Sequence, residues 1–401
     1  MALQKKNKSN ITRFRDDFRF AVAGGLRSLA LIGLLATVIF CIYRYQDDLN
    51  LANARRIYSY LSSARASEKS EFTSFAFEAG LDSEYALFDM GLAVYGGNTF
   101  RYVTALAEGD FVHQMNAARP ALSAGERQVL IYDRGGKNYA VVNSYSCLGS
   151  GTLESPIVSG RMNARGAFCL VTDENGYRAA VTMYDARLNQ VFKWQTSEYY
   201  IVLACPAPDG RTLSALCVSE RDGSTYYTVR VCSVREEEPL CEIPLEGRQV
   251  YSLCYNEEGN LVIIASDGVY IYESDGTLRA SSAYPAGALI AFCHNYGDTP
   301  AVAIRAETAG EGVEVRLVGA DGSPRFTGTY EGVPRAVDLH GNTLAVLFRT
   351  RLVTVDLAAE KPQARARRDT GARDVLVRPD GRMVLVYTDR AELVTLEEDT
   401  Q

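Results

Sequence analysis

Short runs of apolar residues, separated by polar turns that contain glycine, recur along most of this 401-residue chain. The clearest copies begin at Phe168, Tyr251, Ala336 and Asp374, and each has three apolar segments joined by two polar turns. Asp-Gly and Asn-Gly in such turns supply positive φ angles and favour tight hairpins between antiparallel strands. The second apolar segment of a copy is continuous rather than alternating, which is typical of strands covered on both faces. The pattern therefore predicts short antiparallel sheets that stack face to face.

A glycine marks the first turn of each copy, and eight such positions follow one another about 41 residues apart on average. These positions are Gly91, Gly135, Gly176, Gly210, Gly259, Gly297, Gly341 and Gly381. A period near 40 residues is typical of a propeller, in which radial stacking of blades buries both faces of each sheet. We expect an all-β, seven- or eight-bladed β-propeller, with eight blades preferred. A β-sandwich is the alternative, but it would show alternating strands without this period.

The last copy ends after three strands, so its sheet needs a fourth strand from elsewhere in the chain. The segment 72–77, Phe-Thr-Ser-Phe-Ala-Phe, has the aromatic content of a strand and precedes the first copy. We predict that this segment completes the last blade and closes the ring.

Residues 21–43 form a separate pattern, an apolar run broken only by Arg27. A helix of this length spans the hydrocarbon core of a bilayer, and Arg27 lies near one end, where its side chain reaches the headgroups. Six Lys or Arg residues precede the run and three follow it closely, so the positive-inside rule places the N-terminus in the cytoplasm. We predict one transmembrane helix, with the propeller outside the cell membrane. A cleaved signal peptide, with a site at 52–54, is the alternative.

These patterns divide the chain into a basic cytoplasmic tail (1–20), a transmembrane helix (21–43), a juxtamembrane stalk (44–71) and the propeller (72–401). The stalk fits either a helix or a flexible tether. The formal net charge is −7, and positions 44–401 hold 35 basic and 47 acidic residues, a net charge of −12. An acidic body repels a phosphate backbone, which argues against nucleic acid as a partner.

The tetrapeptide Pro-Asp-Gly-Arg occurs at Pro208 and Pro379, each time before an apolar strand. It resembles the repeat of TolB-type and WD40-like bacterial propellers. The order of basic tail, membrane helix and propeller is similar to an uncharacterised bacterial family of single-pass membrane-anchored β-propeller proteins of unknown function. This resemblance covers nearly the whole chain and implies the fold and the anchoring, but no chemistry. Trp194 is the single tryptophan and no Trp-Asp dipeptide occurs, so neither true WD40 repeats nor Trp-docked blades fit.

Motifs for catalysis are absent: the sequence has no H-E-x-x-H, C-x-x-C, G-x-S-x-G or G-x-x-x-x-G-K pattern. His294 and His340 lie near the first turns of successive repeats, where they either bind a metal or cap backbone groups. Carboxylates in the turns either converge on the ring mouth or bond their own backbone, and we favour the second interpretation. They are Asp173, Asp209, Glu257, Asp321 and Asp380. We therefore assign no catalytic, cofactor-binding or metal-binding residue, and we expect no cofactor.

Tyrosine pairs at 199–200 and 226–227 either stack on sugars or pack within strands, and packing is favoured.

Eight of the nine cysteines follow the membrane segment, mostly within apolar strands, where buried free thiols are expected. Cys232 and Cys241 stand apart because they flank the turn 235–238. We predict that these two residues lie directly opposite each other on neighbouring strands, and whether they form a disulfide stays open.

The sequence favours a membrane-anchored extracytoplasmic propeller that acts as a binding or scaffolding module for an envelope component. The expected partners are the lipid bilayer, through residues 21–43, and a protein or envelope polymer on the propeller. The alternative is an extracytoplasmic propeller enzyme, a lactonase or a glycan-active hydrolase, with a cation or a pair of acids at the ring mouth. A scaffold predicts an exposed apolar or aromatic patch, whereas an enzyme predicts carboxylates and histidines converging at one end of the channel.

Overall fold

The computed structural model describes residues 18–44, 74–76, 83–89, 91–103, 111–236, 238–245, 247–294, 299–306, 312–359, 364–369 and 371–394. The chain divides into two units, Met1–Ser62 and Ser63–Gln401, and we describe each by itself. The predicted stalk lies outside the described residues, except for its first position.

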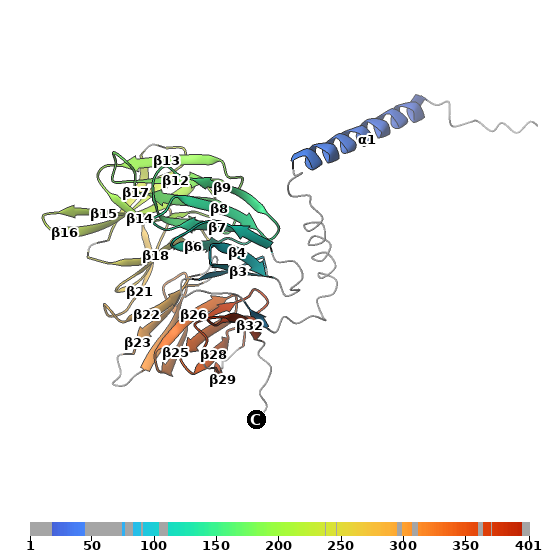
Figure 1. Cartoon of the computed structure of the whole chain (residues 1–401). Coiled ribbons are helices and arrows are strands. Elements are labelled where there is room, and N and C mark those ends of the chain that lie inside the picture. Colours follow the sequence, from blue (N-terminus) through green and yellow to red (C-terminus); the bar gives the residue numbers. More distant parts are fainter. Residues whose placement is uncertain are drawn as a thin grey trace, which may run out of the picture. The chain divides into compact units, whose positions relative to one another are not determined.

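Helix α1 (Phe18–Arg44) in the first unit covers the predicted apolar run (Figure 1). Leucine, isoleucine and alanine dominate its sequence, and the side chains of residues 24–40 are exposed. The hydroxyl of Thr37 donates a hydrogen bond to the carbonyl of Gly33, one turn back. Among the described residues, no helix has the combination of length and apolarity that crossing a membrane requires.

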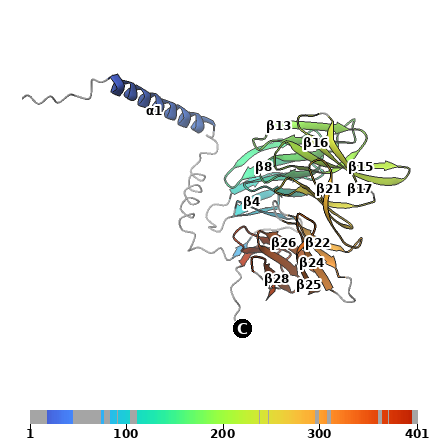
Figure 2. The same ribbon diagram turned by 180° about the vertical axis from the view of Figure 1, so that it is seen from behind.

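Described strands of the second unit form eight four-stranded antiparallel sheets, which are the blades of a β-propeller (Figures 1 and 2). Blade 1 contains β2 (Glu84–Phe88), β3 (Gly91–Gly96), β4 (Thr99–Val103) and β5 (Phe111–Gln114). Blade 2 contains β6 (Pro120–Ala124), β7 (Gln128–Asp133), β8 (Asn138–Asn143) and β9 (Cys147–Thr152). Blade 3 contains β10 (Ile157–Met162), β11 (Phe168–Thr172), β12 (Ala179–Tyr184) and β13 (Gln190–Thr196). Blade 4 contains β14 (Tyr200–Pro206), β15 (Thr212–Arg221), β16 (Ser224–Ser233) and β17 (Pro239–Leu245).

The second half of the ring repeats this order. Blade 5 contains β18 (Val250–Tyr255), β19 (Leu261–Ala265), β20 (Gly268–Tyr272) and β21 (Leu278–Ala283). Blade 6 contains β22 (Leu289–Cys293), β23 (Ala301–Arg305), β24 (Gly312–Val318) and β25 (Pro324–Glu331). Blade 7 contains β26 (Pro334–His340), β27 (Thr343–Phe348), β28 (Arg351–Asp356) and β29 (Ala364–Arg368). Blade 8 contains β30 (Asp374–Val377), β31 (Met383–Val386), β32 (Arg390–Val394) and β1 (Ser74–Ala76).

Strand β1 closes the ring as predicted, because it pairs with β32 and takes the outermost position of blade 8. Phe75 lies opposite Ala391 in this pairing and packs against the apolar space between blades 8 and 1. The eight-bladed count is confirmed, and the preferred all-β propeller is the observed fold.

Burial follows the position of each strand in its blade. The second and third strands are covered on both faces, so β11, β12, β19 and β20 are buried at every residue. The fourth strands face solvent, and every residue of β29 is exposed, including its arginines. Continuous apolar runs thus mark the middle strands, as the sequence pattern predicts.

Apolar side chains fill the spaces between neighbouring blades. One example is the cluster in which Val171 and Val181 of blade 3 pack with Ala204 and Leu213 of blade 4. In the described part of the ring, each of the eight spaces between blades holds one such cluster. This burial of both sheet faces is the main force that holds the blades together.

The predicted turn glycines fit the blades with two exceptions. Gly91, Gly210, Gly259, Gly341 and Gly381 lie at the turn between the first two strands, and Gly297 lies outside the described residues. The assignment is wrong for Gly135 and Gly176, which lie in the turn between the second and third strands of blades 2 and 3. The first strand of blade 3, Ile-Val-Ser-Gly-Arg-Met, has too few apolar residues to stand out, so the apolar pattern places the start of this repeat one strand too late.

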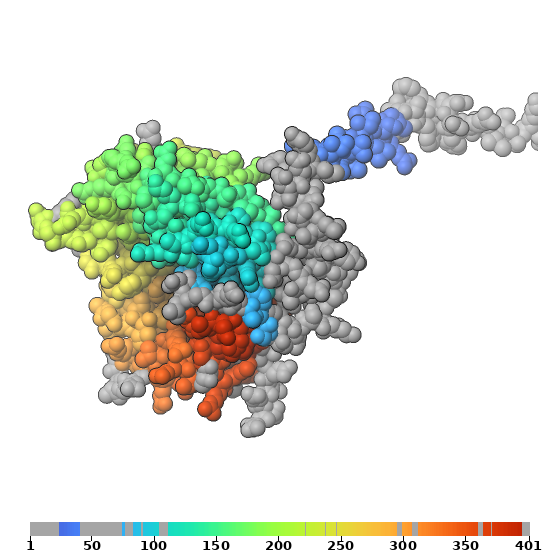
Figure 3. Space-filling view, viewed as in Figure 1, coloured from blue at the N-terminus to red at the C-terminus, as the bar shows by residue number. Residues whose placement is uncertain are grey.

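Because consecutive strands are antiparallel, turns alternate between the two faces of the ring. We call the face with the turns after the first and third strands of each blade the turn face. The opposite face, where the innermost strands begin, is the start face. The hairpin of β15 and β16 is longer than the others and projects at the edge of the ring (Figure 3). Its two-residue turn, Asp222-Gly223, has φ angles of 53° and 73°, as a tight hairpin requires.

Candidate functional site

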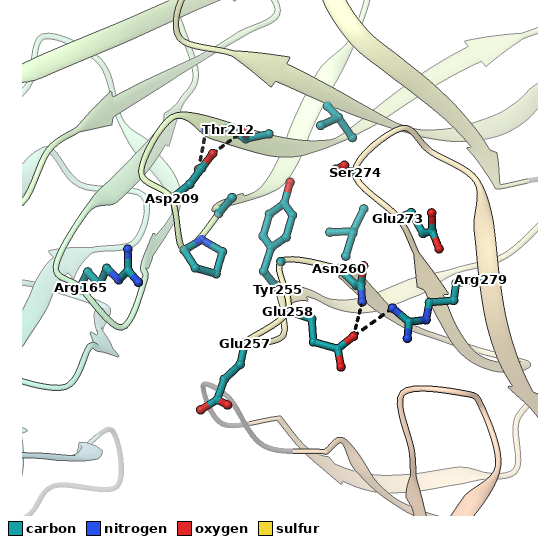
Figure 4. Close-up of a pocket in the computed structure, with 15 residues that line it drawn as sticks. Arg165, Asp209, Thr212, Tyr255, Glu257, Glu258, Asn260, Glu273, Ser274 and Arg279 are labelled. Carbon is teal, nitrogen blue, oxygen red and sulfur yellow. Dashed lines mark hydrogen bonds and ion pairs between the residues drawn. The ribbon is translucent and has the colours of Figure 1, made fainter.

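A cavity of about 580 Å³ opens on the turn face among blades 3, 4 and 5. Three segments supply most of its lining: the β14–β15 turn, the β18–β19 turn and the β20–β21 turn (Figure 4). The lining residues are Arg165, Ala207, Pro208, Asp209, Thr212, Val231, Tyr255, Glu257, Glu258, Gly259, Asn260, Leu261, Glu273, Ser274 and Arg279.

The floor of this cavity is apolar and rigid. Tyr255, the last residue of β18, is buried, and its hydroxyl forms a hydrogen bond with the hydroxyl of Ser214 in blade 4. Burial raises the pKa of this phenol, so it stays protonated at neutral pH. Leu261, Val231 and Pro208 line the same cavity. The floor therefore offers apolar surface and no group that is charged at neutral pH.

Asp209 is used by its own turn. Its Oδ1 accepts hydrogen bonds from the backbone N–H groups of Arg211 at 2.8 Å and Thr212 at 3.1 Å, and Oδ2 lies 3.2 Å from the Thr212 hydroxyl. The same arrangement recurs at Asp321 and Asp380, whose carboxylates accept the backbone N–H groups two residues on. For these three residues the self-bonded turn is confirmed.

A second carboxylate of the rim is also paired. Glu258 accepts a hydrogen bond of 3.0 Å from the side-chain amide of Asn260, and its Oε2 lies 2.9 Å from the guanidinium of Arg279 (Figure 4). Both ionic side chains are more than one third exposed, so solvent weakens this pair. The ion pair of Glu258 and Arg279 holds the β18–β19 turn against β21, but it adds little to the stability of the blade.

Arg165, Glu257 and Glu273 are the charged groups of the rim that remain available. All three are exposed, and none forms a hydrogen bond or ion pair with another described side chain. A cavity with an apolar floor, one available guanidinium and two available carboxylates suits a polar ligand that carries both charges and some apolar surface.

The structure does not bring the five predicted turn carboxylates together. Asp209 and Glu257 line the same cavity, but Asp321 belongs to blade 6 and Asp380 to blade 8. Asp173 follows β11 and therefore lies on the start face. The alternative in which all five carboxylates converge on one mouth of the ring is therefore wrong.

The two turn histidines belong to different blades. His294 follows β22, and its imidazole contacts the Sγ of Cys254 in blade 5, whereas His340 ends β26 in blade 7. Burial, with Arg161 nearby, lowers the pKa of His294 to about 3, and burial raises the pKa of Cys254 well above its ordinary value. Both groups are thus neutral, and no reactive thiolate forms. Within the described residues, no cluster of three His, Cys, Asp or Glu side chains fits a metal ion.

One acidic pair escaped the sequence analysis. Glu84 and Asp374 are the first residues of the innermost strands of blades 1 and 8, on the start face. Burial raises the pKa of both, and Asp338 and Glu84 help to bring that of Asp374 to about 6. Each is a lone acid before an apolar run, so an alignment of the repeats by strand rather than by glycine would have found the pair.

Cys232 and Cys241 are not directly opposite each other, so this prediction is wrong. Leu240 is an extra residue in β17, and it places Cys241 opposite Val231 and Cys232 opposite Pro239. Both thiols are free.

The tyrosine pairs divide between packing and exposure. Tyr199 and Tyr227 are half-buried, while Tyr200 and Tyr226 are exposed. The guanidinium of Arg178 lies 5.3 Å from the centre of the Tyr200 ring.

Comparisons with known proteins agree on the fold. Solved structures similar to this chain include the propeller of Dos1, with a TM-score of 0.57 and 10% identity over 83% of this chain and 96% of that one. Sqt1 of Saccharomyces cerevisiae has a TM-score of 0.56 and 11% identity, over 80% and 98% of the two chains. BamB of Moraxella catarrhalis has a TM-score of 0.52 and 10% identity, over 80% and 98%. No curated protein sequence matches the chain. A model of a family of unknown function (DUF5711) matches residues 64–396.

Proposed function

The chain belongs to the family of unknown function DUF5711, and we propose that it is a binding module of the cell envelope. In this proposal the propeller lies outside the cytoplasmic membrane and holds a protein or polymer of the envelope, while residues 21–43 anchor it in the bilayer. The turn-face cavity is the binding site.

The observation that carries this proposal is the composition of the cavity. Its floor is apolar and its rim offers Arg165, Glu257 and Glu273, which are exposed and unpaired with described side chains. In the described lining, no thiol or imidazole accompanies these groups, so recognition fits the site better than nucleophilic chemistry. Rigid blades on each side keep the rim in place, which limits the entropy that binding costs.

Membrane anchoring rests on the sequence of α1 and its flanks. The run at 21–43 is apolar apart from Arg27, and the basic residues before it outnumber those after it. We expect the full chain to stay in the membrane pellet after alkaline carbonate extraction, and a version starting at residue 63 to become soluble. Protease added to intact cells should digest the propeller. Protection of the propeller in intact cells would contradict the proposed orientation.

The decisive experiment is chemical crosslinking in cells with the tagged full-length protein, followed by purification and mass spectrometry. A version lacking residues 81–401 controls for contacts made by the anchor. A charge swap in the cavity, Arg165→Glu with Glu257→Arg, keeps the net charge and should lose the partner. The matched control swaps two exposed charges on outer strands, Arg367→Glu with Glu331→Arg, and should keep it.

A discrete envelope partner that disappears with the propeller and with the cavity swap would support the binding module. A partner that survives the cavity swap would place the site elsewhere on the propeller. If no partner depends on the propeller, the binding-module proposal fails.

An extracytoplasmic hydrolase acting on lactones or glycans is the second candidate, and the acidic pair of Glu84 and Asp374 favours it. A carboxyl with a pKa of about 6 can serve as a general acid near neutral pH. Screening for hydrolysis of lactone and glycan substrates tests this candidate, with Asp374→Asn as the variant that should abolish any activity found.

A further inference from the structure

The innermost strands of five consecutive blades begin with the same irregularity. In each strand one residue near the start is skipped by the pairing with the second strand, which defines a β-bulge. The skipped residues are Val158 in blade 3, Val202 in blade 4, Tyr251 in blade 5, Ile290 in blade 6 and Arg335 in blade 7. A bulge that recurs at one position of the repeat is a feature of the fold and not a local accident.

The bulges expose side chains that the pattern of the strand would bury. Val158 and Val202 are each 36% exposed and Tyr251 is 40% exposed, whereas Ile157 and Ile201, which precede the valines, are buried. The strands carrying them are the innermost of their blades, so these side chains lie around the start-face opening of the ring. The starts of neighbouring strands are in contact, since the hydroxyl of Ser159 donates to the carbonyl of Val202 across blades 3 and 4.

The other side of this opening is charged. Blades 8 and 1 begin without a bulge, at Asp374 and Glu84. The positive charge of Arg134 favours the ionised form of Glu84, and that of Arg373 favours the ionised form of the neighbouring Tyr85. The guanidinium of Arg335 donates a hydrogen bond to the carbonyl of Ala372, between blades 7 and 8.

Three exposed guanidinium groups and two carboxyls thus lie on this side. Even with both carboxyls ionised, the five groups together carry one more positive than negative charge.

We call this opening, with its exposed apolar arc of Val158, Val202 and Tyr251 and its arginines Arg134, Arg335 and Arg373, the start-face mouth. An apolar arc next to positive charge complements a ligand that joins apolar and acidic groups. The innermost strands have a partner strand on one edge only. Neighbouring blades already bond some backbone groups of the other edge, such as the carbonyl of Val202 and the N–H of Val377, and an added segment can pair with the groups that remain. A polypeptide segment satisfies such groups, and a lipid does not.

We propose that the start-face mouth binds a segment of a partner protein in which apolar side chains alternate with acidic ones. This inference rests on the proposed binding function, but it uses the face opposite the cavity. Leu or Phe side chains of the segment would cover the arc, and its carboxylates would lie against the arginines.

The test measures fluorescence anisotropy of labelled synthetic peptides with the full chain in detergent. One peptide carries Leu and Glu in a Gly-Ser frame, a second carries the same Leu residues with Lys, and a third carries Glu without Leu. We expect the Leu-Glu peptide to bind at least tenfold more tightly than either of the others, and its binding to weaken as salt is raised.

Variants then locate the binding. Tyr251→Ser with Val202→Ser removes exposed apolar surface, and Arg335→Glu reverses a charge; each should weaken the Leu-Glu peptide at least tenfold. Leu278→Ser, in the same blade and 49% exposed, and Arg367→Glu, on an exposed outer strand, are matched controls that should bind as the original chain does. Thermal unfolding of every variant checks that the fold is retained.

Four results would overturn the inference: no binding of the Leu-Glu peptide, equal binding of the Leu-Lys peptide, mouth variants that bind normally, or controls that lose binding as well. Binding of phosphatidylglycerol vesicles that depends on the mouth, without peptide binding, would show a lipid site instead. A crosslinked partner that needs the turn-face cavity but not the mouth would leave the proposed function standing and refute this inference alone.

Discussion

Asp338 connects three blades, and we expect Asp338→Ala to lower the free energy of unfolding by about 2–4 kcal/mol. The side chain of Asp338 is 7% exposed. Its Oδ2 accepts the backbone N–H of Val377 in blade 8 at 2.6 Å, and its Oδ1 lies 2.9 Å from the Sγ of Cys293 in blade 6. Alanine leaves both donors without this acceptor, and a buried unsatisfied donor costs about 1–3 kcal/mol. Asp338→Asn keeps an oxygen for Val377 and should cost less than about 1 kcal/mol.

Urea unfolding, followed by circular dichroism and by the fluorescence of Trp194, measures both variants against the original chain. The asparagine variant is the control, because it has nearly the same volume and separates the loss of an acceptor from the loss of packing. A loss below about 1 kcal/mol for Asp338→Ala would refute the reasoning. So would an asparagine variant as unstable as the alanine variant.

Three further outcomes follow from the fold. Phe75→Ala should destabilise the ring by about 2 kcal/mol, half the cost of a fully buried phenylalanine, whereas Phe75→Leu should cost little; urea unfolding decides, and equal losses would contradict the role of β1. Since burial raises the folded pKa of Asp374 to about 6, the folded state binds this proton more tightly than the unfolded state. Stability should therefore fall as pH rises from about 4 to 6, and Asp374→Asn should remove that part of the fall and be about 3 kcal/mol more stable at pH 7.5; parallel pH profiles of the two proteins would refute this. Peptide mapping without reductant should find Cys232 and Cys241 as free thiols, and a linked peptide would contradict the register of β17.

The repeat could be predicted from sequence because buried middle strands leave an unmistakable apolar run in every blade. The closing strand was predictable for another reason, since a final blade with three strands needs a fourth. It was harder to predict which strand begins each repeat. In blade 3 the innermost strand contains Ser159, Gly160 and Arg161, so its sequence pattern resembles that of a loop. Gly176 then took the place of the first-turn glycine. The period survived this error because each blade still contributed one turn.

The sites depended on information that spacing does not carry. A β-bulge shifts the pairing by one residue, and a continuous apolar run such as that around Val202 contains no signal of which residue is skipped. Leu240 shows the same limit, because one extra residue moved Cys241 out of register with Cys232. The cavity was missed because it combines turns of three blades, and only the folded ring brings Arg165 near Glu257 (Figure 4).

The pairing of β1 with β32 also sets an order of events during synthesis. The strand that completes blade 8 is made first, and its partner emerges about 310 residues later. At about 5–20 residues per second, a ribosome needs on the order of 15–60 s to cover that distance. During this time β1 has no partner, and the ring stays open until the last strands appear. The last three strands of blade 8, β30 to β32, have only four or five residues each. Short open edges offer little template for pairing with other nascent chains, so the last blade to form is also the one least exposed to misassembly.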